Sequence, residues 1–233
     1  MPKHSKRYLA ARETARDEGA VYDVDETVRR VKQGATAKFD ETIEVAIKLG
    51  VNPSRGEETV RGTITLPHGT GKVPRVAVFA KGDAALEAEA AGADRVGAED
   101  LVEAIAQGWS EFDILVAHPE VMRIVGRLGK QLGPRMPSKK AGNITTEVGA
   151  AIQELKAGRV EFKMDKGAVL HVPIGKASFS EEQLKENLAV LISAVVRARP
   201  AAFKGRYIRS IVVSSTMGPG VRLDLQEALA QAA

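Results

Sequence analysis

The stretch His68–Lys72 is the first candidate for chemistry, because it places two glycines before a lysine, as phosphate-binding loops do. Such a loop needs a further glycine five positions before its Gly-Lys pair and a hydroxyl after the lysine, but Leu66 and Val73 stand there. A dinucleotide-binding fingerprint also fails, since Pro74 occupies the place of its third glycine. The stretch is therefore interpreted as a turn or hinge.

The sequence offers few of the residues that a metal site, a reactive thiol or a catalytic nucleophile requires. The chain has no cysteine, which excludes disulfides, thiolate zinc sites, iron–sulfur clusters and a catalytic cysteine. The four histidines are His4, His68, His118 and His171. None has a partner at metal-ligand spacing. Ser214 and Ser215 lie in a strand pattern rather than in a nucleophile elbow. We predict no catalytic residue, no metal and no cofactor.

Basic residues give a stronger signal. The 233 residues carry a net charge of only +4, but the charges are segregated. Six basic residues and no acid lie between Glu120 and Glu147: Arg123, Arg127, Lys130, Arg135, Lys139 and Lys140. Six more and no acid lie between Glu186 and Asp224: Arg197, Arg199, Lys204, Arg206, Arg209 and Arg222. A polyanion such as a nucleic acid needs several such charges, and a solvated basic face is the alternative.

The elements that must position these residues follow two patterns. Alternating apolar and polar residues predict half-buried strands near both chain ends, over residues 42–49, 60–66, 160–164, 168–174, 207–216 and 221–225. The first two are expected to form a hairpin-like pair. Ser180 and Gln183 form a capping-box pattern for a helix that ends before Pro200.

The middle of the chain has uniformly apolar strands, 76–80 and 114–117, among helices over 84–91, 100–107, 119–128 and 146–157. This pattern is typical of a parallel sheet covered on both faces. We therefore predict an α+β split domain from residues 1–69 and 160–233, with an inserted α/β three-layer, Rossmann-like domain at 70–159. An enzyme or ligand-binding protein that uses the inserted domain is the alternative function, because such folds bind ligands at strand ends.

Neither a secretory signal nor a membrane span is expected. The longest apolar helix candidate, Leu188–Val196, covers about nine residues and is well short of the roughly 20 that a bilayer requires. The chain is predicted to be cytoplasmic, with no membrane partner.

Five segments, in order along the chain, carry a resemblance to a known family. They are Ala37–Glu44, Leu66–Gly69, Gly133–Arg135 with Lys140–Gly142, Gly175–Phe179 and Ser215–Gly218. Together they resemble the L-one family of ribosomal proteins, and the similarity extends from Lys3 to about Leu223. The family's fold is split, with an RNA-binding domain made from both chain ends and an inserted α/β domain.

The resemblance implies a non-enzymatic constituent of the large ribosomal subunit that is a monomer when free. It implies binding to 23S rRNA at the mobile stalk beside the exit site, assistance in the release of deacylated exit-site tRNA, and repression of the chain's own operon through its mRNA. The implied RNA contacts are Lys38, Phe39, Thr42, Arg55, His171, Lys176, Thr216, Met217 and Gly218. Arg135, Lys139 and Lys140 are expected to make a secondary RNA contact.

The residue types suit RNA. A threonine hydroxyl such as that of Thr216 can meet a ribose 2′-OH, Gly218 permits close backbone approach, and Met217 adapts to an irregular surface. Each has an ordinary alternative: Phe39 as a core aromatic, Met217 as a residue that covers the core, and Thr42 as an outward-facing strand residue. Net charge agrees with the resemblance, because residues 70–159 hold 12 basic and 12 acidic residues while the flanking parts hold 22 and 18.

Overall fold

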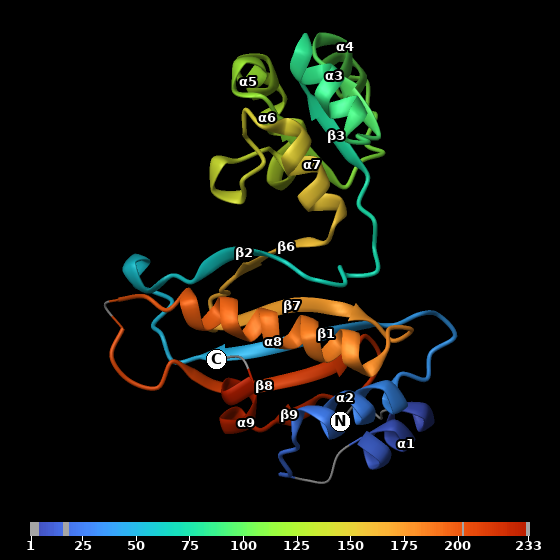
Figure 1. Ribbon diagram of the computed structural model, residues 1–233, viewed down its shortest axis with the longest axis vertical. Coiled ribbons are helices and arrows are strands. Elements are labelled where there is room, and N and C mark those ends of the chain that lie inside the picture. The colour runs from blue at the N-terminus through green and yellow to red at the C-terminus, as the bar shows by residue number, and fades with distance from the viewer. Residues whose placement is uncertain (1–4, 16–18, 202, 232–233) are drawn as a thin grey trace. The chain divides into compact units, whose positions relative to one another are not determined.

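The computed structural model describes residues 5–15, 19–201 and 203–231, without the side chain of Lys140 (Figure 1). Contacts between residues divide the chain into two compact units. One, here called the split unit, is formed by the chain up to Gly71 and from Val160 onward. The other, here called the inserted unit, spans Lys72–Arg159. His4 lies outside the described residues.

A four-stranded antiparallel sheet forms the centre of the split unit. Its order is β7 (Val169–Lys176), β1 (Thr42–Leu49), β8 (Ile208–Ser215) and β9 (Val221–Leu223). Every second residue of β1 from Ile43 to Leu49 is buried, as the alternation predicts. The intervening residues, from Thr42 to Lys48, are half-buried or exposed and define what we call the outer face of the sheet.

Two helices cover the inner face of this sheet, α2 (Val24–Gly34) and α8 (Glu181–Arg197) (Figure 1). The capping box predicted for α8 is confirmed: Gln183 N–H donates to Ser180 Oγ, and Ser180 N–H donates to the Gln183 side chain. Shorter helices complete the unit: α1 (Lys6–Ala15), α9 (Leu225–Gln231) and the 3-10 turn η1 (Gly56–Glu58). Because α2 and α8 pack against the inner face, the outer face of the sheet is not covered by these two helices and is available for binding.

The expected hairpin-like pair of the first two strands is wrong. Strand β2 (Arg61–Thr65) pairs with β6 (Arg159–Lys163) in a separate two-stranded sheet. β1 is central and hydrogen-bonds β7 and β8 on its two sides, so no edge of β1 is left for β2. Alternation fixes which face a strand buries, but it does not choose the neighbouring strand.

The inserted unit has a three-stranded parallel sheet, as the apolar strand pattern predicts. Its order is β4 (Arg95–Gly97), β3 (Val76–Phe79) and β5 (Ile114–Ala117). Its helices are α3 (Asp83–Ala90), α4 (Glu99–Ala106), α5 (Met122–Val125), α6 (Gly129–Leu132) and α7 (Val148–Lys156). One face packs Ala77 and Phe79 against α4 and α5, while the other packs Val76 and Val78 against α3 and α7. The sheet is therefore covered on both faces.

The helix expected over residues 119–128 is broken into short pieces. It consists of η2 (Pro119–Val121), α5 and η3 (Gly126–Leu128), followed by α6, η4 (Gly133–Arg135) and η5 (Lys139–Ala141). Gly126, Gly129 and Gly133 fall within this run, and each glycine weakens a continuous helix by about 1 kcal/mol relative to alanine. In the part of the chain that the structure describes, no helix is long and apolar enough to cross a membrane.

Asp113 forms hydrogen bonds with Lys72 and Arg75 at the start of the inserted unit, and its contribution to stability is expected to depend on pH. Its carboxylate accepts hydrogen bonds from Arg75 N at 3.0 Å and Lys72 Nζ at 3.1 Å, which lower the pKa of Asp113 from 3.8 to about 2. The carboxylate therefore stabilises the fold above about pH 4, and this stabilisation is lost as the pH falls towards 2. Asp113→Asn should lower the free energy of unfolding by about 1 kcal/mol at pH 7, since the group is partly exposed.

Urea unfolding at pH 7 and near pH 2 tests this expectation, with the exposed neighbour Glu111→Gln as the control. The Asp113→Asn defect should shrink at the lower pH and the control should stay close to the wild type at pH 7. An equal defect at both pH values would contradict the assigned role of the Asp113 charge.

Candidate nucleic-acid interface

One end of the four-stranded sheet gathers most of the predicted RNA contacts. Thr42 pairs with Lys176 across β1 and β7, and the next residue of β1 pairs with Ser215 at the end of β8. Thr42 and Thr216 are joined by three hydrogen bonds: Thr216 N to Thr42 O at 3.0 Å, Thr42 N to Thr216 Oγ1 at 3.0 Å, and Thr216 Oγ1 to Thr42 O at 3.1 Å. We call Lys38, Phe39, Thr42, Lys176, Thr216, Met217 and Gly218 the edge cluster.

A buried carboxylate holds the two loops of the edge cluster together. Glu41 Oε1 accepts from Ala37 N at 2.8 Å, and Oε2 accepts from Met217 N at 2.8 Å. Glu41 is only 1% exposed. Burial by itself raises the pKa of the Glu41 carboxyl, but the N–H groups of Met217 and Ala37, together with the Ser215 hydroxyl and the charge of Arg7, lower the pKa below its usual value. The ionised group therefore fixes residues 37–41 beside residues 216–218.

Glu41 is not among the predicted site residues, although its position in the sequence carries a signal. Residues 43, 45, 47 and 49 of β1 are buried, and position 41 continues that alternation onto the inner face. A charged residue at a buried position needs hydrogen-bond donors around it. Glu41 therefore marks a place where two backbone segments must converge.

Two large apolar side chains of the edge cluster face solvent. Phe39 is 55% exposed and Met217 is 49% exposed. The alternative of Phe39 as a core aromatic is thus wrong, while Met217 keeps about half of its side chain available to a ligand. Thr42 does lie on the outer face, as its ordinary alternative states, and is half-buried. An exposed aromatic ring and a thioether beside lysines make a surface that suits unstacked bases.

A β-bulge directs Lys176 to this surface. Ile43 pairs with Gly175 and Glu44 with Pro173, so the register shifts by one residue and both Ile174 and Gly175 are buried. Without the bulge, strict alternation would place Lys176 on the inner face. Glycine is needed at 175, because a Cβ there would come within 2.8 Å of Phe179 and 2.9 Å of Leu184.

The hydroxyl and ammonium groups of the edge cluster retain free bonding capacity. Lys176 Nζ donates to Thr42 Oγ1 at 2.8 Å, which leaves the Thr42 hydroxyl proton and the other ammonium protons for a ligand. The Thr216 hydroxyl already donates to Thr42 O, so towards a ligand it can only accept. Thr42 and Lys176, with the exposed ammonium of Lys38, are therefore the side-chain donors of the cluster, and Thr216 mainly holds its shape.

Gly218 supports the turn after β8, and its replacement gives a prediction. Gly218 N donates to Ser215 O at 3.1 Å, and an added Cβ would overlap Ser215 Oγ. Because Ser215 is buried and cannot withdraw freely, Gly218→Ala should lower the free energy of unfolding by roughly 1–3 kcal/mol. Thermal unfolding measures this loss. Gly56→Ala is the control, since a Cβ there meets no atom within 4 Å, and an equal loss in both variants would contradict the steric argument.

Other predicted contacts lie outside the edge cluster. His171 is exposed on the outer face and pairs with Ala46, in the middle of β1. Arg55 lies in the loop beyond the far end of β1, where it forms an ion pair with Glu58 at 3.1 Å. The sheet therefore separates Arg55 and His171 from Thr216, although all three remain in the split unit.

The predicted secondary contact lies in the inserted unit. Arg135 is exposed in η4 with its guanidinium 5.7 Å from the centre of the Phe112 ring, and Lys139 is exposed in η5. The side chain of Lys140 lies outside the described residues. Within the described ranges, no three His, Asp or Glu side chains are grouped so that they could hold a metal ion.

Comparison with known proteins identifies the family of the chain. A model of the "Ribosomal protein L1p/L10e family" matches residues 31–219, a span that includes every member of the edge cluster. The chain belongs to this ribosomal protein family. The protein named "Large ribosomal subunit protein uL1" from Kosmotoga olearia is 53% identical over 229 residues, which cover 97% of this chain and 99% of the relative. Because L1p/L10e members are structural ribosomal proteins, the chain is not an enzyme and that alternative is set aside.

Proposed function

We propose that the chain is a structural constituent of the large ribosomal subunit and binds 23S rRNA at the mobile stalk through the edge cluster. Family membership and the name of the 53% identical relative support the ribosomal setting. The ribosome-associated chain is then cytoplasmic, and it is a monomer when free. The exposed pair Phe39 and Met217, fixed by the buried Glu41, is the observation that carries the RNA site.

The chemistry of the edge cluster favours an irregular RNA over a regular duplex. Phe39 offers a ring face on which a base or ribose can pack, and Met217 a flexible apolar contact. Thr42 and Lys176 supply donors for a 2′-hydroxyl and a phosphate. Because Glu41 fixes both loops before RNA arrives, little ordering remains to oppose binding.

We further propose a division of labour between the units. The split unit, residues 1–69 and 160–233, is the RNA-binding domain, and residues 70–159 form an inserted three-layer α/β domain. Arg135, Lys139 and Lys140 of the inserted domain make a secondary contact with rRNA or tRNA, and the chain assists release of deacylated exit-site tRNA. The edge cluster that binds rRNA also binds the chain's own operon mRNA and so represses its translation.

Equilibrium binding tests this function directly. The full chain should bind a stalk fragment of 23S rRNA with an affinity that falls steeply with salt, since several phosphates are contacted. A random RNA duplex of the same length should bind far more weakly. Equal affinity for both RNAs, or an affinity independent of salt, would contradict the proposal.

A further inference from the structure

The second basic tract without acids, between Glu186 and Asp224, contributes three arginines to a hollow that lies outside the edge cluster. Arg206, Arg209 and Arg222 line one hollow of about 560 Å³ beside β8 and β9. All three are exposed, and none of their guanidinium groups forms a hydrogen bond or ion pair with another described residue. These three guanidinium groups therefore place three positive charges around one hollow without a carboxylate of another described residue bound to any of them.

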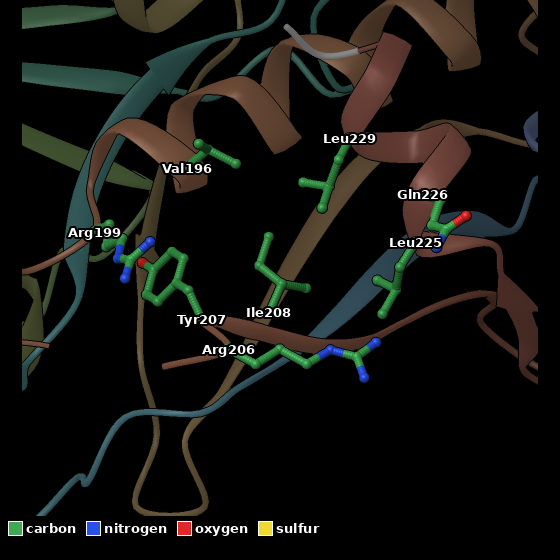
Figure 2. A pocket seen from close by; sticks show the side chains of 8 residues that line it. All are labelled: Val196, Arg199, Arg206, Tyr207, Ile208, Leu225, Gln226 and Leu229. Carbon is green, nitrogen blue, oxygen red and sulfur yellow. The ribbon is translucent and has the colours of Figure 1, made fainter. Parts of the chain in front are cut away.

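The pairing of β8 and β9 determines the directions of the Arg209 and Arg222 side chains. Arg222 pairs with Val212 and so shares the outer face with it. Arg209 is the extra residue of a bulge, because Leu49 pairs with Ile208 while Lys48 pairs with Ser210. Arg206 precedes β8, and Figure 2 shows its side chain extending towards Leu225 and Gln226. The backbone positions of these three arginines therefore bring their side chains to the same hollow.

Among the described residues that line this hollow, the one acid, Asp224, already accepts two hydrogen bonds. Asp224 Oδ1 accepts from Gln226 N at 2.7 Å and from Glu227 N at 3.2 Å at the start of α9. These N–H groups offset part of its negative charge. The hollow thus keeps an excess of positive charge.

An adjoining hollow of about 470 Å³ shares Arg206 with the first (Figure 2). Its wall is mainly apolar, with Val196, Ile208 and Leu229. Arg199 also lines it, but its guanidinium donates to Phe203 O at 3.3 Å and to Gly205 O at 3.5 Å. Arg199 is therefore a structural group, whereas Arg206, which lines both hollows, keeps its guanidinium available for a ligand.

We infer that Arg206, Arg209 and Arg222 form a second anion site, which binds the phosphate backbone of the same RNA that the edge cluster contacts. This inference rests on the proposed RNA-binding function. Guanidinium groups bind phosphate oxygens in pairs of parallel hydrogen bonds, and unpaired ones need no prior ion pair to be broken. Ser215, the last residue of β8 and the neighbour of Thr216, is six residues from Arg209, roughly 20 Å at about 3.3 Å per residue, so the two sites contact different parts of the RNA.

The test compares Arg209→Gln/Arg222→Gln with Arg197→Gln/Lys204→Gln, which removes the same charge from the same tract outside the hollow. Binding of the full chain to the stalk fragment is measured across a salt series. The first variant should bind at least about tenfold more weakly, and its slope of log affinity against log salt should be shallower by roughly 1 to 2. The second should retain nearly the wild-type slope. Circular dichroism and thermal unfolding establish that both variants are folded.

Two further measurements separate the possible outcomes. Arg222→Lys should keep the wild-type salt slope but lose part of the affinity, since lysine cannot bind phosphate with a planar fork. Losses from Arg209→Gln/Arg222→Gln and Met217→Ala should add, because the sites are well separated. Unchanged RNA affinity in Arg209→Gln/Arg222→Gln, or an equal loss in the control, would overturn this site and leave the edge cluster intact. A wild-type chain that does not prefer the stalk fragment would instead overturn the proposed function and this site with it.

Discussion

Replacing Phe39 and Met217 together by alanine should weaken binding to the 23S stalk fragment by at least about 30-fold, or about 2 kcal/mol. Both side chains are roughly half exposed in the free chain, so they are available to pack on RNA. A single base stacked on an aromatic ring contributes about 1–3 kcal/mol, and Met217 adds apolar contact beside it. Fluorescence anisotropy with a labelled fragment measures the loss. The temperature of unfolding should stay within a few degrees of the wild type, since neither residue is in the core.

The matched control for this pair is Leu86→Ala. Leu86 is 66% exposed, but it lies on α3 of the inserted unit. Its loss should leave RNA affinity close to that of the wild type. If Leu86→Ala weakened binding as much as the double variant, general surface hydrophobicity rather than the edge cluster would explain the affinity.

Glu41→Ala should lower the free energy of unfolding by about 3 kcal/mol near pH 7. The change leaves the partly buried N–H groups of Ala37 and Met217 without their acceptor, and each such group costs roughly 1–3 kcal/mol, with the lower half of that range expected here. Loops that are no longer tied should also bind RNA more weakly, because the order of Phe39 and Met217 must then be supplied on binding. Urea unfolding and anisotropy measure the two effects on the same variant.

The pH dependence of Glu41→Gln separates its charge from its shape. Since the native pKa of Glu41 lies below its ordinary value of 4.5, its charge stabilises the fold above that pH, and the stabilisation is lost as the pH falls through the native pKa. The difference between wild type and Glu41→Gln should therefore shrink below about pH 4.5. Glu44→Gln is the control, on the exposed face of the same strand. A defect in Glu44→Gln as large as that in Glu41→Gln would contradict the assignment.

The strands and their buried faces could be predicted from the sequence, because period-two alternation states directly which residues are inside. The apolar strands at 76–79 and 114–117 likewise indicated a parallel sheet. Strand partners could not be predicted in this way: β2 pairs with β6, about a hundred residues later, and local pattern carries no information on that choice.

Helices near the chain ends were missed although α2 has ordinary signals. Asp23 caps its first turn by accepting from Glu26 N, and Val24, Val28 and Val31 form its buried face. Both features are visible in the sequence. In contrast, β4 spans three residues, Arg95–Gly97, and is too short for any periodicity to show.

For the edge cluster, the resemblance predicted the residues, and the structure supplied their positions relative to one another. Resemblance named Thr42, Lys176 and Thr216, which lie far apart along the chain, and the structure brings them together. It did not separate them from Arg55, which lies beyond the other end of β1. Strict alternation would have buried Lys176, and only the bulge at Gly175 explains why that lysine meets Thr42.

Hydrogen exchange of the full chain, with and without the 23S stalk fragment, tests the central claim most directly. Slower exchange is predicted in residues 37–44, 174–179 and 214–219, the segments of the edge cluster, and little change in α8, which covers the opposite face of the sheet. Saturating RNA that slows exchange in the inserted unit alone, and leaves these segments unchanged, would contradict the edge cluster as the RNA-binding site.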